Sequence, residues 1–141
     1  MPIINDHGFD GKPEGAPLLS LAALECGGGE AGAGLEITND TDAREVAPYL
    51  SIAPVIAITF PNFADGRGFS LARRLRAMGY TGTLRAKGHL IADQFPMARA
   101  CGFDEVEVDD VLAERQPEVQ WLSAQTEWRH GLSAAHLRAA E

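Results

Sequence analysis

The sequence predicts one α/β domain of about four consecutive βα units around a parallel sheet. Its 141 residues suit a single domain with a sizeable core. From residue 35 onward, short apolar strands alternate with stretches of helical periodicity. This alternation implies parallel pairing with right-handed crossovers, which fits either a half-barrel-like sheet or a small open three-layer sheet. We expect the core to span 35–125, between an irregular N-terminal segment (1–34) and a tail (126–141) that is helical or frayed.

Composition excludes several classes of protein. The formal net charge of −8 argues against nucleic acid as a general partner. No apolar run approaches the ~20 residues that a membrane-spanning helix needs. The N-terminus has neither a basic start nor an apolar signal core, so we expect a cytoplasmic protein that does not contact membranes. Two cysteines, Cys26 and Cys101, are too few for a disulfide framework.

The N-terminal segment is rich in glycine and proline and carries one apolar piece, 18–24, which suits a short strand or a helical turn. Gly27, Gly29 and Gly32 have the spacing of a dinucleotide-binding fingerprint. That fingerprint needs a strand before it and a helix that opens within it, and here no long strand precedes the glycines. The sequence therefore predicts no dinucleotide site.

The first two strands of the core are predicted from apolar runs at 35–38 and 55–60. Between them, Asp42 followed by Glu45 has the spacing of a capping box, which predicts a helix through Leu50.

A helix over 70–78 is predicted after the second strand, with Gly79 as its C-cap. The third strand is expected at 83–87. In the segment 89–100 that follows, Pro96 should kink or split a helix.

The fourth strand, 105–108, alternates Glu and Val and therefore predicts an edge strand half-exposed to water. Asp109 or Asp110 should cap a last helical stretch, which is interrupted near Pro117. A parallel sheet of four strands leaves two open edges. A homodimer would cover them, and so would a strand added by the N-terminal segment.

Polar side chains follow each predicted strand, at the edge where the carboxyl ends of parallel strands meet and where ligands bind in such folds. This rim is expected to collect Asn39, Asp40, Asn62, Asp65, Arg67, Lys87, His89, Asp109 and Asp110. The start of helix 70–78 adds free backbone N–H groups and the positive end of a helix dipole. Arg85 and Lys87 share one face of their strand. We therefore predict a site for a small oxyanion, such as sulfate, sulfite or phosphate, or for a carboxylate. Its predicted ligand-binding residues are Gly66, Arg67, Gly68, Ser70, Arg85, Lys87, Asp93 and Gln94.

Two rim residues are candidates for catalysis. His89 follows a strand end, where an imidazole suits general acid–base work, although an ordinary surface histidine fits as well. Asp65 precedes a glycine and so either shapes the turn or takes part in chemistry. The chain shows no His/Cys metal cluster, phosphate-binding Walker loop or nucleophile elbow.

Blocks of sequence from 60 to 104 resemble a bacterial family known as domain of unknown function 934. They are Phe60-Pro61-x-Phe63-x-Asp65-Gly66-Arg67-Gly68-Phe69-Ser70-x-Ala72-Arg73-x-Leu75-Arg76, Gly79-Tyr80-x-Gly82-x-Leu84-Arg85-Ala86-x-Gly88, Asp93-Gln94 and Cys101-Gly102-Phe103-Asp104. The resemblance spans roughly 35–125. One departure is His89, where the family typically has Asp.

Members of that family are usually labelled as oxidoreductases of sulfite reduction, on the basis of gene neighbourhoods. The resemblance implies a role beside sulfite reductase or another sulfate-assimilation enzyme. A cubane iron–sulfur cluster needs about four cysteine ligands, and this chain has two cysteines and no cofactor motif. We therefore expect an accessory protein without cofactors or metals, which binds an oxyanion or docks on a redox partner. A small enzyme acting on an anionic metabolite and a structural subunit are the alternatives.

Overall fold

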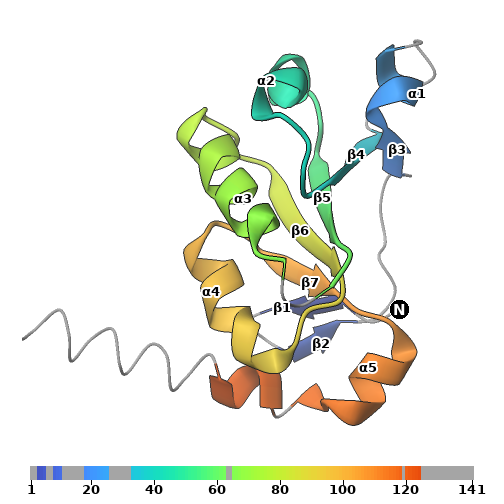
Figure 1. Ribbon diagram of the computed structural model, residues 1–141, viewed down its shortest axis with the longest axis vertical. Helices are drawn as coiled ribbons and strands as arrows, with labels where there is room; N and C mark the ends of the chain where they lie inside the picture. Colours follow the sequence, from blue (N-terminus) through green and yellow to red (C-terminus); the bar gives the residue numbers. More distant parts are fainter. Residues whose placement is uncertain are drawn as a thin grey trace, which may run out of the picture.

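Five parallel strands lie side by side in the order in which the chain forms them, within the residues that the structure describes (3–5, 8–10, 18–25, 33–62, 65–118 and 120–124). The structure is a computed structural model (Figure 1). The parallel strands are β3 (Leu18–Ser20), β4 (Gly34–Thr38), β5 (Val55–Phe60), β6 (Thr83–Gly88) and β7 (Glu105–Glu107). The α/β class and the parallel sheet are confirmed, with one more parallel strand than predicted.

The N-terminal segment adds strands at both edges of this sheet. β1 (Ile3–Asn5) pairs antiparallel with β7, and β2 (Gly8–Asp10) pairs antiparallel with β1, while β3 lies beyond β4. The complete order is β2-β1-β7-β6-β5-β4-β3. The prediction that 105–108 is an edge strand is therefore wrong, because β1 covers that edge. The predicted homodimer stays a prediction.

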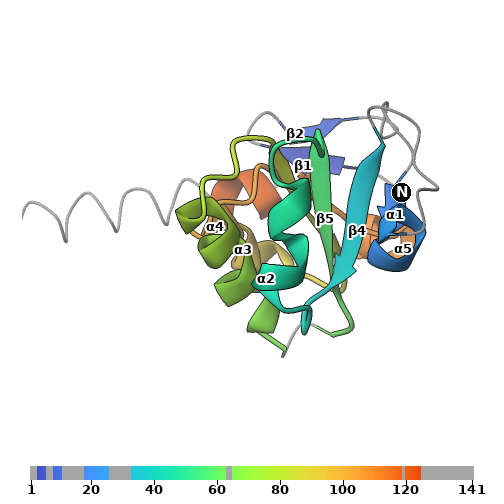
Figure 2. The ribbon, with the colours of Figure 1, turned by 90° about the horizontal axis from the view of Figure 1, so that it is seen from above.

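Helices connect the strands. They are α1 (Leu21–Glu25), α2 (Ala43–Val46), α3 (Arg67–Ala77), α4 (Phe95–Ala100) and α5 (Asp110–Arg115), together with the 3-10 turns η1 (Ala47–Tyr49) and η2 (Ala92–Gln94). Right-handed crossovers between consecutive neighbouring strands place their helices on one face of the sheet. Figure 2 shows α2, α3 and α4 together on one side of β4 and β5.

Local chemistry sets the helix boundaries. Asp42 is the N-cap of α2, as predicted, and its side chain accepts a hydrogen bond from the backbone N–H of Arg44. The predicted helix is shorter than expected, because Pro48 lies in a 3-10 turn that replaces the rest of it. α3 begins at Arg67 instead of 70, because the Asp65 carboxylate accepts from the Arg67 N–H and Gly66 is the N-cap. Gly79 ends that helix with a φ of 100°, as expected for a C-cap glycine.

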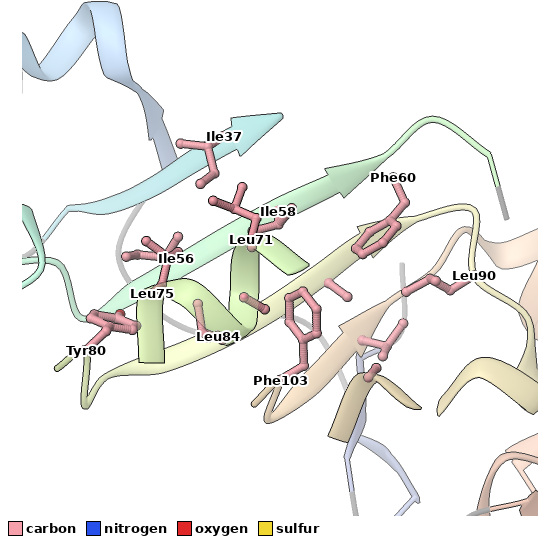
Figure 3. Close-up of a cluster of buried hydrophobic side chains, with 14 of the residues drawn as sticks. Ile37, Ile56, Ile58, Phe60, Leu71, Leu75, Tyr80, Leu84, Leu90 and Phe103 are labelled. Carbon is pink, nitrogen blue, oxygen red and sulfur yellow. The ribbon is translucent and has the colours of Figure 1, made fainter. Parts of the chain in front are cut away.

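The core fills the space between the helices and the sheet. Ile56, Ile58 and Phe60 of β5 point toward α3, where Leu71 and Leu75 meet them (Figure 3). Strand residues at the same register positions belong to this face, including Leu35, Ile37, Leu84, Ala86, Val106 and Ile4. None of the described helices is long and apolar enough to cross a membrane.

Candidate functional site

Five of the predicted ligand-binding residues lie in three separate places. The first is a pocket of about 590 Å³ where the loop after β4 meets one side of α3. We call it the arginine pocket, and its lining is Asn39, Asp40, Thr41, Asp42, Ala43, Arg44, Arg67, Ser70, Leu71 and Arg74. Of the predicted anion-binding residues, this pocket brings together Arg67 and Ser70.

Three guanidinium groups line the arginine pocket, and two of them are held by neighbouring carboxylates. Arg67 donates to both oxygens of Asp65, with Nη2 2.7 Å from Oδ2 and Nε 3.0 Å from Oδ1. Arg44 donates to Asp42 in the same way, with Nη2 2.8 Å from Oδ2. Arg74 has no hydrogen bond or ion pair among the residues that the structure describes. A guanidinium that is not hydrogen-bonded to a carboxylate keeps its donors for an anion, although Arg74 also feels the nearby charge of Asp42.

The carboxylates beside these arginines stay ionised. The Arg67 guanidinium, and after it the Asn39 amide, hold the pKa of Asp65 well below its usual range. The Arg44 side chain and its backbone N–H lower the pKa of Asp42 to about 2. The Thr38 hydroxyl lowers the pKa of Asp40, since Oγ1 lies 2.5 Å from Asp40 Oδ1. At neutral pH, the lining of the pocket therefore carries three cations, Arg44, Arg67 and Arg74, and two carboxylates, Asp40 and Asp42.

Asn39 lines the pocket with an unsatisfied donor. The residue is only 6% exposed, and its Nδ2 atom is buried without a hydrogen-bond partner in the described part of the chain. The amide is close enough to Asp65 to lower the pKa of that carboxyl, yet the geometry is not that of a hydrogen bond. A buried donor without a partner costs about 1–3 kcal/mol.

The second place is the face of the sheet opposite the helices, which carries alternating charges. Arg85 and Lys87 share this face, as predicted, with Glu105 and Glu107 opposite them on β7 and Glu36 two strands away on β4. Arg85 Nε lies 2.8 Å from Glu105 Oε1, and Lys87 Nζ lies 3.3 Å from Glu36 Oε2 and 3.7 Å from Glu107 Oε2. The two cations are therefore paired with three carboxylates on the sheet, away from the arginine pocket.

The third place is a smaller pocket of about 280 Å³ between the loop after β6 and the residues after α5. It is lined by Ile91, Ala92, Asp93, Gln116, Gln120, Ser123 and Ala124. Asp93 reaches this pocket, whereas the Gln94 side chain accepts from the Ile91 N–H and so holds the loop.

The remaining candidates take local positions. Gly68 is buried, and a Cβ there would lie 2.6 Å from Phe60 Cε1, so this glycine lets Phe60 pack under α3. Gly66 is exposed at the N-cap of α3. His89 is exposed and lines neither of these two pockets. Catalytic roles for His89 and Asp65 stay predictions.

The predicted ligand-binding residues did not include Arg44, Arg74 or the glutamates of the sheet. Arg44 and Arg74 come from two helices, and nothing in the spacing of the sequence shows that their side chains meet. The glutamates had a signal: Arg85 and Lys87 occur two residues apart on one strand, and Glu105 and Glu107 have the same spacing on the next. Complementary charges at matching positions of neighbouring parallel strands indicate cross-strand ion pairs.

Comparison with known proteins identifies a family without a known activity. The sequence model of a family described as "Bacterial protein of unknown function (DUF934)" matches residues 34–138. No curated protein matches the chain.

Proposed function

We propose that this chain, which belongs to the DUF934 family of bacterial proteins of unknown function, binds a small anionic group in the arginine pocket. The observation that carries the proposal is the meeting of Arg74, whose guanidinium is unpaired among the described residues, with the buried, unsatisfied Nδ2 of Asn39 in one cavity. Both groups are donors, and the carboxylates nearest to them, Asp65 beside Asn39 and Asp42 beside Arg74, are held by Arg67 and Arg44. An oxyanion carries acceptors for both donors.

The surrounding groups support the same ligand chemistry. Ser70 lies in the first turn of α3 and adds a hydroxyl, and the helix dipole places partial positive charge at that end. Asp42 and Asp65 hold the guanidinium groups of Arg44 and Arg67 in fixed orientations. Pre-oriented donors lose less entropy when a ligand binds.

We further propose that the protein is an accessory of assimilatory sulfite or sulfate reduction, in which case the anion is a sulfur oxyanion. The support is the resemblance stated above, because family members are labelled for sulfite reduction. Sulfite and sulfate both offer the acceptor oxygens that Arg74 and Asn39 lack.

Isothermal titration calorimetry with sulfite, sulfate and phosphate at low ionic strength tests the proposal, with sulfite handled under nitrogen. Arg74→Ala should weaken binding about tenfold or more, since hydrogen bonds to charged groups are worth about 1.5–3 kcal/mol. Arg73→Ala is the matched control. It removes the same charge from the next position of α3, where Arg73 Nη2 faces Cys101 Sγ outside the pocket. Absence of binding by all three anions would overturn the proposal.

Docking of an acidic redox partner is a second candidate, favoured by the exposure of Arg44, Arg67, Arg73 and Arg74 on α2 and α3 of an acidic protein. A broad patch of this kind would lose affinity equally in Arg73→Ala and Arg74→Ala, and Arg67→Lys would change little. The affinity for a sulfite reductase, measured by sedimentation at increasing salt concentrations, should then fall steeply with ionic strength. Binding that is insensitive to salt and to these variants would exclude docking through the arginines.

A further inference from the structure

The geometry points to a hydroxylated organic anion as the ligand of the arginine pocket: a phosphate or sulfate monoester that carries neighbouring hydroxyl groups, of sugar-phosphate size. This inference rests on the proposed anion binding and names its ligand class. A bare oxyanion would use only part of what the pocket offers.

The first argument is size. The cavity of about 590 Å³ falls in the range of pockets that hold organic ligands, roughly 300–1,000 Å³. A bare tetrahedral oxyanion is only a few times larger than a water molecule, which takes about 30 Å³ in the liquid. Such an ion would leave most of the cavity to solvent, so a ligand with a larger body matches it better.

The second argument is the mixture of polar groups. α3 supplies donors and positive charge through Arg67, Ser70 and Arg74, whereas the loop after β4 supplies acceptors through Asp40 and Thr41. Asp42, which also lines the pocket, is occupied by Arg44. A bare sulfate dianion has no donor for these acceptors and hydrogen phosphate has a single O–H group, whereas a hydroxylated ester carries several donors.

Asp40 is suited to bind a hydroxyl group. Its Oδ1 atom accepts from the Thr38 hydroxyl, which orients the carboxylate and leaves Oδ2 for a ligand. The side chain is exposed, at the surface of the pocket. A carboxylate that accepts from two adjacent hydroxyls is a common way to recognise a sugar ring, because both of its oxygens are acceptors only. The anionic oxygens of the phosphate or sulfate group of the same molecule would meet Arg74.

The buried amide of Asn39 gives an independent indication that something binds here. Its Nδ2 is without a hydrogen-bond partner among the described residues, although the residue is more than nine-tenths buried and lines the cavity. Buried polar groups in proteins nearly always have a partner. The Nδ2 atom itself is not exposed in the cavity, so a ligand oxygen would reach this donor only after a small movement of the Asn39 side chain.

The experiment compares three probes by calorimetry on the full chain: inorganic phosphate, methyl phosphate and ribose 5-phosphate. We expect ribose 5-phosphate to bind at least tenfold more tightly than methyl phosphate, since only the former has hydroxyls for Asp40. Asp40→Asn should remove most of that preference while phosphate binds no more weakly, because the change also removes a repelling charge. Glu114→Gln, on the exposed face of α5, is the control for net charge. Arg74→Ala should weaken all three probes.

The outcomes separate the two proposals. Equal affinity for methyl phosphate and ribose 5-phosphate, or a preference that survives Asp40→Asn, overturns the hydroxylated ligand and leaves anion binding standing. Failure of all three probes to bind, together with sulfite and sulfate, overturns both. Thermal unfolding of Asp40→Asn serves as a check that the variant is folded.

Discussion

Arg76 Nη2 lies 2.7 Å from Asp104 Oδ2, an ion pair that ties α3 to the start of β7 across 28 residues of sequence. The same guanidinium donates to three backbone carbonyls, those of Tyr80, Gly82 and Gly102. Asp104 Oδ2 in turn accepts from the Leu84 N–H. One arginine thus satisfies carbonyls from two turns, and in this role its planar set of donors matters more than its charge.

Arg76→Lys should therefore destabilise the protein, although it keeps the charge. A lysine ammonium cannot reach the same set of carbonyls, so we expect a loss of about 2 kcal/mol in the free energy of unfolding. Urea denaturation followed by circular dichroism measures it. Arg73→Lys on the exposed side of the same helix is the control and should change stability by less than about 0.5 kcal/mol. Equal effects of the two substitutions would contradict the structural role of Arg76.

Gly68→Ala should destabilise the protein even though alanine favours helices. The added Cβ would press on the Phe60 ring, which has Phe69 and Phe103 beside it with centroids 5.1 and 5.9 Å away. Overpacking of this kind costs about 1–3 kcal/mol. Gly66→Ala is the control, since a Cβ there meets only Phe69 Cδ2, at 3.7 Å. A melting temperature of Gly68→Ala at or above that of Gly66→Ala would show that the ring gives way freely.

Glu107→Gln should cost about 3 kcal/mol, in the lower part of the range for breaking a buried ion pair. The Glu107 side chain is only 5% exposed and lies between Arg85 and Lys87, with Oε1 3.8 Å from Arg85 Nη1. A neutral glutamine at this position removes a negative charge that balances Arg85 and Lys87. Lys87→Gln in the same background should restore part of the loss, which a double-mutant cycle by chemical denaturation would measure. Additive losses would mean that Lys87 and Glu107 do not interact.

Asp42 should titrate near pH 2, below the ordinary aspartate value of 3.8. Because its folded-state pKa is depressed, the stabilisation from Asp42 is present above about pH 4 and is lost as the pH falls toward 2. Carbon-detected NMR titration of the side-chain carboxyl gives the value directly. Arg44→Ala should raise the pKa of Asp42 toward 3.8, whereas Arg115→Ala on α5 should leave it unchanged. A pKa of Asp42 that does not respond to Arg44→Ala would rule out this ion pair as the main cause.

The βα order was predictable because local patterns decide it. The apolar run of β5 ends at Pro61, and Gly79 and Gly102 stop two helices with positive φ, so local residues mark these boundaries. The position of β7 inside the sheet was not predictable, because alternation of Glu and Val is the usual pattern of a strand exposed on one face. Only the pairing of β1 with β7 and the ion pairs with Arg85 and Lys87 account for a buried Glu107.

The candidate site was predicted in part for a similar reason. Arg67 and Ser70 follow a strand end, and topology alone brings strand ends to one rim. The same rule also gathered Arg85 and Lys87, but their side chains point from the body of β6 and meet carboxylates on the sheet. Side-chain direction along a strand, and pairing with distant partners, decided which rim residues share a pocket.

The pairing of β1 with β7 has a practical consequence for anyone who cuts this chain. The family match begins at residue 34, which would exclude β1, β2 and β3, yet Ile4 is fully buried in the common core. A fragment trimmed to the matched region would expose one flank of β7 and one flank of β4, each with unpaired backbone groups. Exposed strand edges with unpaired backbone groups pair with strands of other molecules. Expression of the matched region alone should therefore yield aggregates, and the first 33 residues belong in any fragment intended to stay in solution.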